Sequence, residues 1–364
     1  MAIRAFVMSD IHIEMDQHLV ERAQQAAAMG SSRSMGWWEH LRDRRNIMPS
    51  HPFLGPDLYD AIGADLLLLA GDIGVGAEMT AGYAIDASRF LGCPVCLCLG
   101  NHDFYDGVEM GKTIADIRAI IAASKGARVH LLDNERTDFE VRGRHLAVLG
   151  GTTWTDYCLN RESCQGAAMA EAERGLNDHR LIRYQGRRFR PQDALELHQK
   201  ARAWLSVAAP VARAESDVLV VMTHHGMTPM ANPPRYRGGK LSPAFASNME
   251  LEIRSWGADL VIHGHTHSNV DVAIGNSRVL SHQRGYLGMD EDELPPANTF
   301  LPLLVECDDG QCRWSCALNQ DEVDMLLFGR VEPIVPLTEE ERARKTDITE
   351  GIRVIESKDG GDHV

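Results

Sequence analysis

Histidine, aspartate and asparagine recur in five short clusters, and each cluster follows a run of apolar residues. Two clusters alternate, because Asp10 and His12 are two residues apart, as are His265 and His267. Residues two apart on an extended segment point the same way, so each pair can face one cation. Imidazole with carboxylate and amide oxygen suits Mn²⁺, iron or Zn²⁺, and a cluster without thiolate disfavours Cu(I) or iron–sulfur. The clusters are Asp10-Ile11-His12, Gly71-Asp72, Gly100-Asn101-His102-Asp103, Thr223-His224-His225 and Gly264-His265-Thr266-His267.

Each cluster taken alone has an ordinary structural explanation. A Gly-Asp pair is common in turns, an Asn-His-Asp run is common in surface loops, and a histidine at a strand end often bonds a backbone carbonyl. Five such clusters, each directly after an apolar run, favour one shared site instead. Ligands in open α/β folds gather beyond the carboxyl ends of the strands. The sequence therefore predicts a metal centre.

Apolar runs alternate with stretches of helical character, which predicts a layered α/β fold. The apolar runs cover residues 5–8, 66–70, 95–99, 146–149, 218–222 and 260–263, and the helical stretches cover residues 78–91, 108–124, 191–207 and 243–255. Pro191 suits a first helical turn, and Ser242 is the expected cap of the last helix. Residues 270–274 and 278–281 predict an antiparallel hairpin through Gly275-Asn276. We expect two mixed sheets packed face to face, with helices outside.

Two polar segments interrupt this alternation, over residues 16–57 and 155–200. Both are predicted to be insertions between core strands, and hence rim or lid elements of the site. Residues 1–332 would then form one domain. Residues 333–364 are charged, with a Pro-rich entry, and are expected to form a peripheral tail.

The charge of the chain limits its partners. A formal net charge of −15 in 364 residues argues against a protein that coats nucleic acid, since such proteins rely on clustered Lys and Arg. Five arginines between Arg180 and Arg190 form the only dense basic cluster of the sequence. They could gather an anionic substrate, or form a solvated or ion-paired helix end. We favour the structural alternative.

The sequence shows neither a signal peptide nor an apolar stretch of membrane-spanning length, so we expect a cytoplasmic protein without membrane contact. In that compartment its eight cysteines are expected to be reduced. Cys93 and Cys96 have the spacing of a redox or zinc pair, but they flank the start of an apolar run. Cys307, Cys312 and Cys316 are too loosely spaced to complete a zinc site. Buried structural cysteines are the favoured interpretation.

In their order along the chain, the five clusters resemble the pattern of the calcineurin-like metallophosphoesterase superfamily. That pattern is Asp-x-His, Gly-Asp, Gly-Asn-His-Asp/Glu, a strand-end His and Gly-His-x-His, and it spans roughly residues 1–285 here. Residues 150–156 and Pro234-Arg235-Tyr236 also look like a bacterial branch whose substrates are mostly unassigned. The long interval from Asp10 to Asp72 departs from the pattern and leaves the substrate open. The resemblance implies a four-layer α/β–β/α sandwich.

The resemblance also implies a dinuclear metal centre. Two divalent cations about 3.5–4 Å apart would clamp the attacking and leaving oxygens, and a hydroxide between them would attack phosphorus. The cations would be Mn²⁺, iron or Zn²⁺. The implied ligands are Asp10, His12, Asp72 and His267 for the first cation, and Asp72, Asn101, His224 and His265 for the second, with Asp72 as the bridge.

His102 is implied to face the substrate phosphate, where it could protonate the leaving oxygen. Asp103 could hold the ring of His102 in the required tautomer. His225 is a candidate substrate contact or support for a ligand, and His263 is expected to be a buried structural histidine. Three residues after the hairpin are candidates to border the cleft, namely His282, Arg284 and Tyr286. Of these, Arg284 could contact phosphate or lie on the surface.

The resulting expectation is a metal-dependent phosphoric ester hydrolase that cuts a phosphomonoester or phosphodiester. A small phosphorylated substrate fits best, and extended nucleic-acid binding is not expected. A nuclease acting on nucleic-acid ends is an alternative. The net negative charge of the chain argues against a nuclease, whereas the arginine cluster is compatible with one. A non-catalytic protein-binding scaffold of the same fold is another. The complete ligand set argues against the scaffold.

Overall fold

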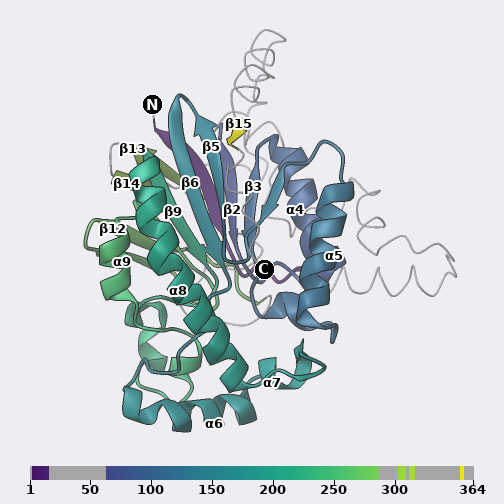
Figure 1. Ribbon diagram of the computed structural model, residues 1–364, viewed down its shortest axis with the longest axis vertical. Coiled ribbons are helices and arrows are strands. Elements are labelled where there is room, and N and C mark those ends of the chain that lie inside the picture. Colours follow the sequence, from purple (N-terminus) through teal and green to yellow (C-terminus); the bar gives the residue numbers. More distant parts are fainter. Residues whose placement is uncertain are drawn as a thin grey trace, which may run out of the picture.

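Two β-sheets pack face to face, and helices cover both outer sides (Figure 1). The computed structural model describes residues 2–15, 63–286, 300, 302–308, 311–315 and 353–355. The segment 16–57, predicted to be an insertion, lies outside the described residues. The expected sandwich of two mixed sheets flanked by helices is confirmed.

Within the described residues, the first sheet has six strands and the second has seven. In spatial order, the first contains β14 (Gln311–Ser315), β13 (Leu303–Asp308), β1 (Ile3–Met8), β2 (Leu66–Ala70), β3 (Val95–Cys98) and β4 (Val129–Leu131). The second contains β11 (Val270–Ile274), β12 (Ser277–Ser281), β10 (Leu260–Ile262), β9 (Val218–Thr223), β6 (Arg144–Gly151), β5 (Glu135–Val141) and β15 (Arg353–Ile355). Neighbours β1, β2, β3 and β4 run parallel, as do β6, β9, β10 and β12.

In the part of the chain that the structure describes, three apolar cores separate the four layers. In β2, Leu66 faces the second sheet, whereas Leu67 packs on the helices outside the first. In β9, Val220 faces the first sheet and Leu219 packs on the helices outside the second. Strands buried on both faces are apolar throughout, which explains the uninterrupted runs in the sequence. The covering helices are α4 (Ala77–Leu91) and α5 (Met110–Ala123) on the first sheet, and α8 (Pro191–Glu215) and α9 (Glu250–Trp256) on the second.

Most predicted elements are confirmed, including the start of α8 at Pro191 and the β11–β12 hairpin. The single helix predicted over 243–255 is wrong. A 3₁₀ turn, η6 (Ser242–Ala244), is followed by extended chain, and α9 begins only after Met249. The amide of Ser247 donates to the carbonyl of Gly226, and that of Met249 donates to Met227. These contacts to the loop after β9 replace the helical hydrogen bonds of residues 246–249.

Residues 155–200 connect β6 to the first half of α8. They contain α6 (Gln165–Gly175), α7 (Asp178–Leu181) and a small hairpin of β7 (Arg183–Tyr184) and β8 (Arg187–Arg188). In Figure 1, α6 and α7 lie beyond the lower ends of the strands. At the other end of the chain, residues 353–355 of the expected tail pair with β5 at the edge of the second sheet.

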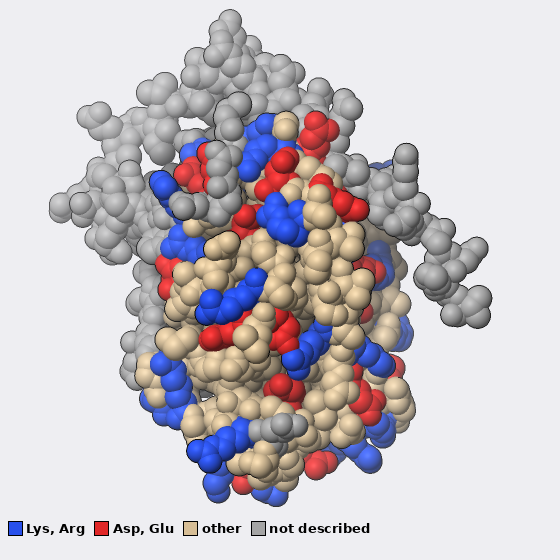
Figure 2. Space-filling model, turned by 60° about the vertical axis from the view of Figure 1, so that its left-hand side comes forward, with Lys and Arg blue, Asp and Glu red and all other residues tan. Residues whose placement is uncertain are grey.

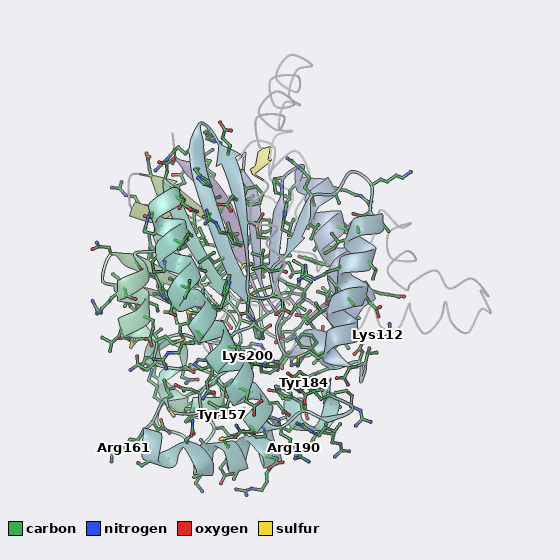
Figure 3. The ribbon with its side chains drawn as sticks, in the orientation of Figure 1. Lys112, Tyr157, Arg161, Tyr184, Arg190 and Lys200 are labelled. Atoms are coloured by element: carbon green, nitrogen blue, oxygen red, sulfur yellow. A yellow bond between two sulfur atoms is a disulfide. The ribbon has the colours of Figure 1, made fainter. Side chains whose placement is uncertain are left out.

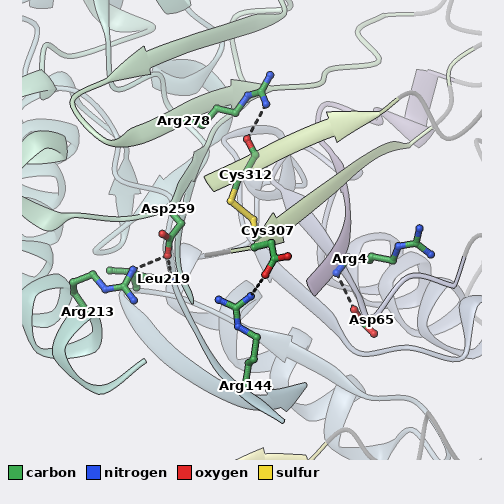
Figure 4. The surroundings of a disulfide bond; sticks show 10 residues. Arg4, Asp65, Arg144, Arg213, Leu219, Asp259, Arg278, Cys307 and Cys312 are labelled. Carbon is green, nitrogen blue, oxygen red and sulfur yellow. Dashed lines mark hydrogen bonds and ion pairs between the residues drawn. A yellow bond between two sulfur atoms is a disulfide. The ribbon is translucent and has the colours of Figure 1, made fainter. Parts of the chain in front are cut away.

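The expectation that all cysteines are reduced is wrong at one pair. Cys307 and Cys312 face each other across β13 and β14 and form a disulfide (Figure 4). The Arg278 guanidinium donates to the carbonyl of Cys312 over 2.8 Å. Cys93 and Cys96 are free and buried, as expected, and burial raises the pKa of Cys93 to about 12.

None of the helices in the described part of the chain is long and apolar enough to cross a membrane.

Candidate metal centre

The five predicted clusters meet at one end of the sandwich. β1, β2 and β3 run parallel in the first sheet, and β9 and β10 run parallel in the second, so their carboxyl ends share an edge. The side chains come from different loops, and all of those named here are buried except that of His267, which is partly buried. Asp10 and His12 follow β1, Asp72 follows β2, Asn101 and His102 follow β3, His224 follows β9, and His265 and His267 follow β10.

Four of the predicted ligands surround one position. Nε2 of His12 lies 3.0 Å from Nε2 of His267 and 3.8 Å from Oδ2 of Asp72. Nε2 of His267 lies 3.5 Å from Oδ1 of Asp10. Ligand atoms about 2.0–2.1 Å from one cation, at right angles to each other, are about 3 Å apart. Two imidazole nitrogens facing each other at that separation fit a shared cation.

A second position lies on the other side of Asp72. Nε2 of His224 is 3.3 Å from Oδ2 of Asp72 and 3.0 Å from Oδ1 of Asn101. Nε2 of His265 is buried and has no hydrogen-bond partner among the described residues. Asp72, His224 and His265 offer ligand atoms within 4.8 Å of one another. A buried nitrogen with an unused lone pair beside a carboxylate fits a cation ligand.

Asp72 lies between the two positions. Its Oδ1 accepts a hydrogen bond from the backbone amide of His102 over 2.8 Å, which leaves Oδ2 to face His12 and His224. Burial alone would raise the pKa of Asp72, but the neighbouring imidazoles outweigh burial and hold this pKa well below its usual range. An ionised carboxylate with one oxygen pointing at both positions can bridge two cations.

The ligand loops adopt a backbone conformation that side chains rarely take. The φ angles are 52° at Asp10, 47° at His12, 53° at Asp72, 75° at His265 and 45° at His267. Left-handed backbone at non-glycine residues is strained and clusters at functional sites. Hydrogen bonds between the loops stabilise this strained backbone. For example, the Asp10 amide donates to the Gly71 carbonyl over 3.0 Å.

Two glycines let the loops approach the carboxylates. A Cβ on Gly100 would overlap Oδ1 of Asp72, and a Cβ on Gly264 would overlap Oδ2 of Asp10. Each glycine precedes a ligand in the sequence. The glycines in these clusters are therefore explained by close packing at the site.

Asp103 holds the loops together. Its carboxylate accepts from the amides of Gly100 (2.7 Å) and Asp72 (3.1 Å) and from Oγ1 of Thr80 (2.6 Å). Burial and the charge of Asp72 raise the pKa of Asp103 to about 7. The expected contact of Asp103 with the ring of His102 is not found, because the carboxylate is committed to these donors.

Glu14 takes the place beside the His102 ring instead. Oε1 of Glu14 lies 3.1 Å from Nδ1 of His102 and 3.0 Å from Nδ1 of His12. Burial alone would raise the pKa of Glu14, but these two hydrogen bonds lower it to about 2. Tyr286 was a candidate for the cleft border, and its hydroxyl lies 3.0 Å from Nε2 of His102. The alternation Asp10-x-His12-x-Glu14 is the sequence signal by which Glu14 could have been found.

Comparison with known proteins agrees with this geometry. Residues 3–269 match the family described as calcineurin-like phosphoesterase, which is most of the chain. The chain belongs to the calcineurin-like phosphoesterase family. No protein with a curated description matches the chain.

Similar solved structures include phosphopantetheinyl hydrolase (PptH) from Mycobacterium tuberculosis. It has 15% identity and a TM-score of 0.49, over 78% of this chain and 90% of that one. A dimetal phosphatase from Danio rerio has 12% identity and a TM-score of 0.44, over 87% of this chain and 96% of that one. At this level of similarity, neither structure carries an argument about the substrate of this calcineurin-like phosphoesterase.

A pocket of about 440 Å³ opens over the candidate metal centre. Its floor includes Asp72, Asn101, His102, His265 and His267. Residues from the 155–200 segment and from the loop after β9 also line it. These include Leu176, Asp178, Arg235, Tyr236 and Phe245, and Tyr286 is a further lining residue.

Asp178, in α7, holds the amide of Asn101. Nδ2 of Asn101 donates to Oδ1 of Asp178 over 2.9 Å, and the Tyr105 hydroxyl donates to the same oxygen. Burial and the charge of Asp178 raise the pKa of Tyr105 well above its usual range. With Nδ2 engaged, Oδ1 of Asn101 faces His224. The 155–200 segment thus orients an amide in the candidate metal centre, which the sequence analysis missed.

We expect Asp178→Ala to weaken binding of one cation about 10-fold or more, because an unheld amide can turn its nitrogen toward the cation. Titration calorimetry with Mn²⁺, on protein from which metal has been removed with a chelator, measures this affinity directly. Asp116→Ala, at a partly exposed position of α5, is the control and should bind both cations as the wild type does. Unchanged Mn²⁺ affinities in Asp178→Ala would contradict the assigned orientation of Asn101.

The structure buries His225 and Arg284, which were candidates to contact the substrate. His225 is buried, and its ring lies between Trp154 and His265, at centroid distances of 5.1 and 4.1 Å. Arg284 is also buried, and its Nη1 donates to the carbonyl of Ile11 over 2.7 Å. Neither residue lines the pocket. Both support the site from outside the pocket lining, because their side chains pack against its loops or form hydrogen bonds to them.

The arginine cluster lies outside the pocket. Arg187 makes two hydrogen bonds to Asp193, at 2.6 and 2.7 Å, and Arg180 donates to the carbonyl of Arg174. Figure 3 shows Tyr184 and Arg190, of the same segment, in the lower part of the molecule. On the face drawn in Figure 2, basic and acidic side chains are interspersed rather than gathered in a basic band. These contacts agree with the structural interpretation of the cluster.

Proposed function

We propose that the chain is a dinuclear metal-dependent phosphoesterase that hydrolyses a phosphomonoester or phosphodiester. The observation that carries the proposal is Asp72, whose Oδ2 lies 3.8 Å from Nε2 of His12 and 3.3 Å from Nε2 of His224. Two divalent cations bound on either side would activate a water for attack on phosphorus and stabilise the leaving oxygen. Mn²⁺, iron and Zn²⁺ all suit these ligands.

In this proposal the chain's own residues orient the substrate and supply a proton. His102 lies in the pocket floor with its Nε2 toward the Tyr286 hydroxyl. Burial lowers the pKa of His102, but the charges of Asp72 and Glu14 outweigh burial and raise it. A ring that holds its proton in this way can donate it to the leaving oxygen.

A small phosphorylated molecule is the proposed substrate. The pocket volume of about 440 Å³ lies within the range of small-molecule sites. Arg235 is the only lysine or arginine among the described lining residues, whereas a nuclease needs a longer basic surface. Every cation ligand that the family pattern implies is present in the sequence, which argues against a non-catalytic scaffold. A cytoplasmic location is part of the proposal, with the Cys307–Cys312 disulfide as the observation that opposes it.

The test is turnover of bis-p-nitrophenyl phosphate and p-nitrophenyl phosphate by protein from which metal has been removed with a chelator, with and without added Mn²⁺. We expect cleavage only with the cation, because the ligands alone hold no nucleophile. The ratio of the two rates assigns the enzyme to diesters or monoesters. Absence of cleavage together with absence of bound metal would contradict the proposal, and bound metal is measured on the same sample.

A further inference from the structure

One carboxylate oxygen contacts two histidines with different tasks. Oε1 of Glu14 lies 3.0 Å from Nδ1 of His12, a candidate cation ligand, and 3.1 Å from Nδ1 of His102, the candidate proton donor. The two rings meet edge to face, with centroids 4.5 Å apart. Glu14 is therefore placed between the first cation position and the pocket floor.

The chemistry of the carboxylate fixes the hydrogens on both rings. An ionised carboxylate only accepts hydrogen bonds, so each Nδ1 in contact with it must carry a hydrogen. In a neutral imidazole the other nitrogen then holds a lone pair. For His12 that nitrogen is Nε2, which faces His267 and Asp72. For His102 it is Nε2 beside the Tyr286 hydroxyl, which donates to it or accepts from it as the ring changes its protonation state.

The surroundings of Glu14 favour this single arrangement. Its side chain is only 14% exposed, which limits the access of water to the carboxylate. The turn η1 (Ile13–Met15) is held by the Ile13 amide, which donates to the Ile73 carbonyl over 3.1 Å, and by the Met15 amide, which donates to His12 over 2.9 Å. A shorter side chain at position 14 would withdraw the carboxylate from both rings.

We propose that Glu14 is a positioning residue that sets the tautomers of His12 and His102 together, and so couples cation binding to proton donation. This inference rests on the proposed function for the role of His102. Outer contacts of this kind orient metal-binding histidines, and their loss typically costs 10–100-fold in cation affinity. Glu14→Gln has the same shape as the native residue but no charge. Its amide NH₂ would lie either at the buried Oε2 position, which has no partner among the described residues, or at the Oε1 position, where it would donate to both rings and require the opposite tautomers.

The first test is independent of activity. Nitrogen-15 NMR of the metal-free protein, at a pH where both rings are neutral, reports which ring nitrogen of each histidine carries the hydrogen. We expect the Nδ1–H form for His12 and His102 in the wild type, and a changed tautomer for at least one ring in Glu14→Gln. Nε2–H forms in the wild type would overturn the proposal, whether or not the chain is a hydrolase.

The second test compares Glu14→Gln, Glu14→Asp and His102→Ala in Mn²⁺ affinity and in turnover of aryl phosphates with increasingly basic leaving groups. In Glu14→Gln we expect Mn²⁺ affinity at the first position to fall about 10-fold or more. We also expect kcat at saturating Mn²⁺ to fall about 10²-fold for the most basic leaving group and less for p-nitrophenol. His102→Ala should show only the second loss, and Glu14→Asp should not restore either property.

Glu196→Gln, on the exposed face of α8, is the matched control and should change neither property. Thermal melting of each variant identifies loss of fold. A folded Glu14→Gln with wild-type Mn²⁺ affinity and wild-type leaving-group dependence would overturn the coupling. If the wild type cleaves no ester, the proposed function fails, while the tautomer measurement still decides the role of Glu14.

Discussion

Replacing Asp72 with alanine will lower turnover by at least about 10³-fold while the fold is retained. Oδ2 of Asp72 faces both cation positions, so its loss weakens both at once. Oδ1 also accepts from the amide of His102, so the loop that carries the candidate proton donor loses a contact. Measurements of kcat in excess Mn²⁺, with bound metal counted by mass spectrometry, check this result.

Asp116→Ala is again the control, because Asp116 is partly exposed on α5 and pairs only with Lys112 among the described contacts. It should keep wild-type turnover and bind two cations. An Asp72→Ala protein that kept both properties at matched free Mn²⁺ would disprove the bridging role. Circular dichroism separates a missing ligand from a misfolded chain.

Substituting alanine for Gly100 should lower kcat/KM on the order of 10²-fold, although no ligand is removed. The new Cβ would overlap Oδ1 of Asp72, so either the carboxylate or the loop with Asn101 and His102 must shift. Displacements of about 1 Å at a reacting centre have effects of this size. Calorimetry should show weaker Mn²⁺ binding in the same variant.

Gly111→Ala supplies the matched control for this change. Gly111 is exposed in the first turn of α5, and a Cβ there meets no atom within 4 Å. The substitution should leave activity unchanged and raise the free energy of unfolding by up to about 1 kcal/mol, because alanine favours helix over glycine. Equal kinetics for the Gly100 and Gly111 variants would refute the packing argument.

The ligand clusters could be predicted because each lies within a few residues of a strand end. A buried strand such as β2 or β9 is apolar on both faces, so the first polar residue after it marks the edge of the sheet. The order of Asp10, Asp72, Asn101, His224 and His265 along the chain then matches the order of the strands that carry them.

Contacts between distant segments could not be predicted in this way. Glu14 and His102 are 88 residues apart, and Asn101 and Asp178 are 77 apart, so their pairing depends on how the loops fold back. From its residue type, Arg284 could contact phosphate or lie on the surface, but the structure buries its guanidinium against the Ile11 carbonyl. A single sequence shows that a polar residue is near the site, but not which neighbour it bonds.

The helix predicted over 243–255 illustrates a second limit. Its residues have helical character, yet the amides of Ser247 and Met249 donate to the loop after β9. Tertiary hydrogen bonds override local propensity at this point. The Cys307–Cys312 disulfide likewise depends on the register of β13 and β14, which sequence spacing does not reveal.

The division of the ligands between the two sheets has a mechanical consequence. Loops of the first sheet carry Asp72 and His12, and loops of the second carry His224 and His267, so each cation position draws on both halves of the sandwich. A bound cation would therefore link the two sheets across their interface. Conversely, the thickness of the apolar layer between the sheets would set the distance between the ligands that each sheet contributes. We therefore expect a substitution that changes the volume of a residue such as Val220, deep in that layer, to change this distance without removing a ligand.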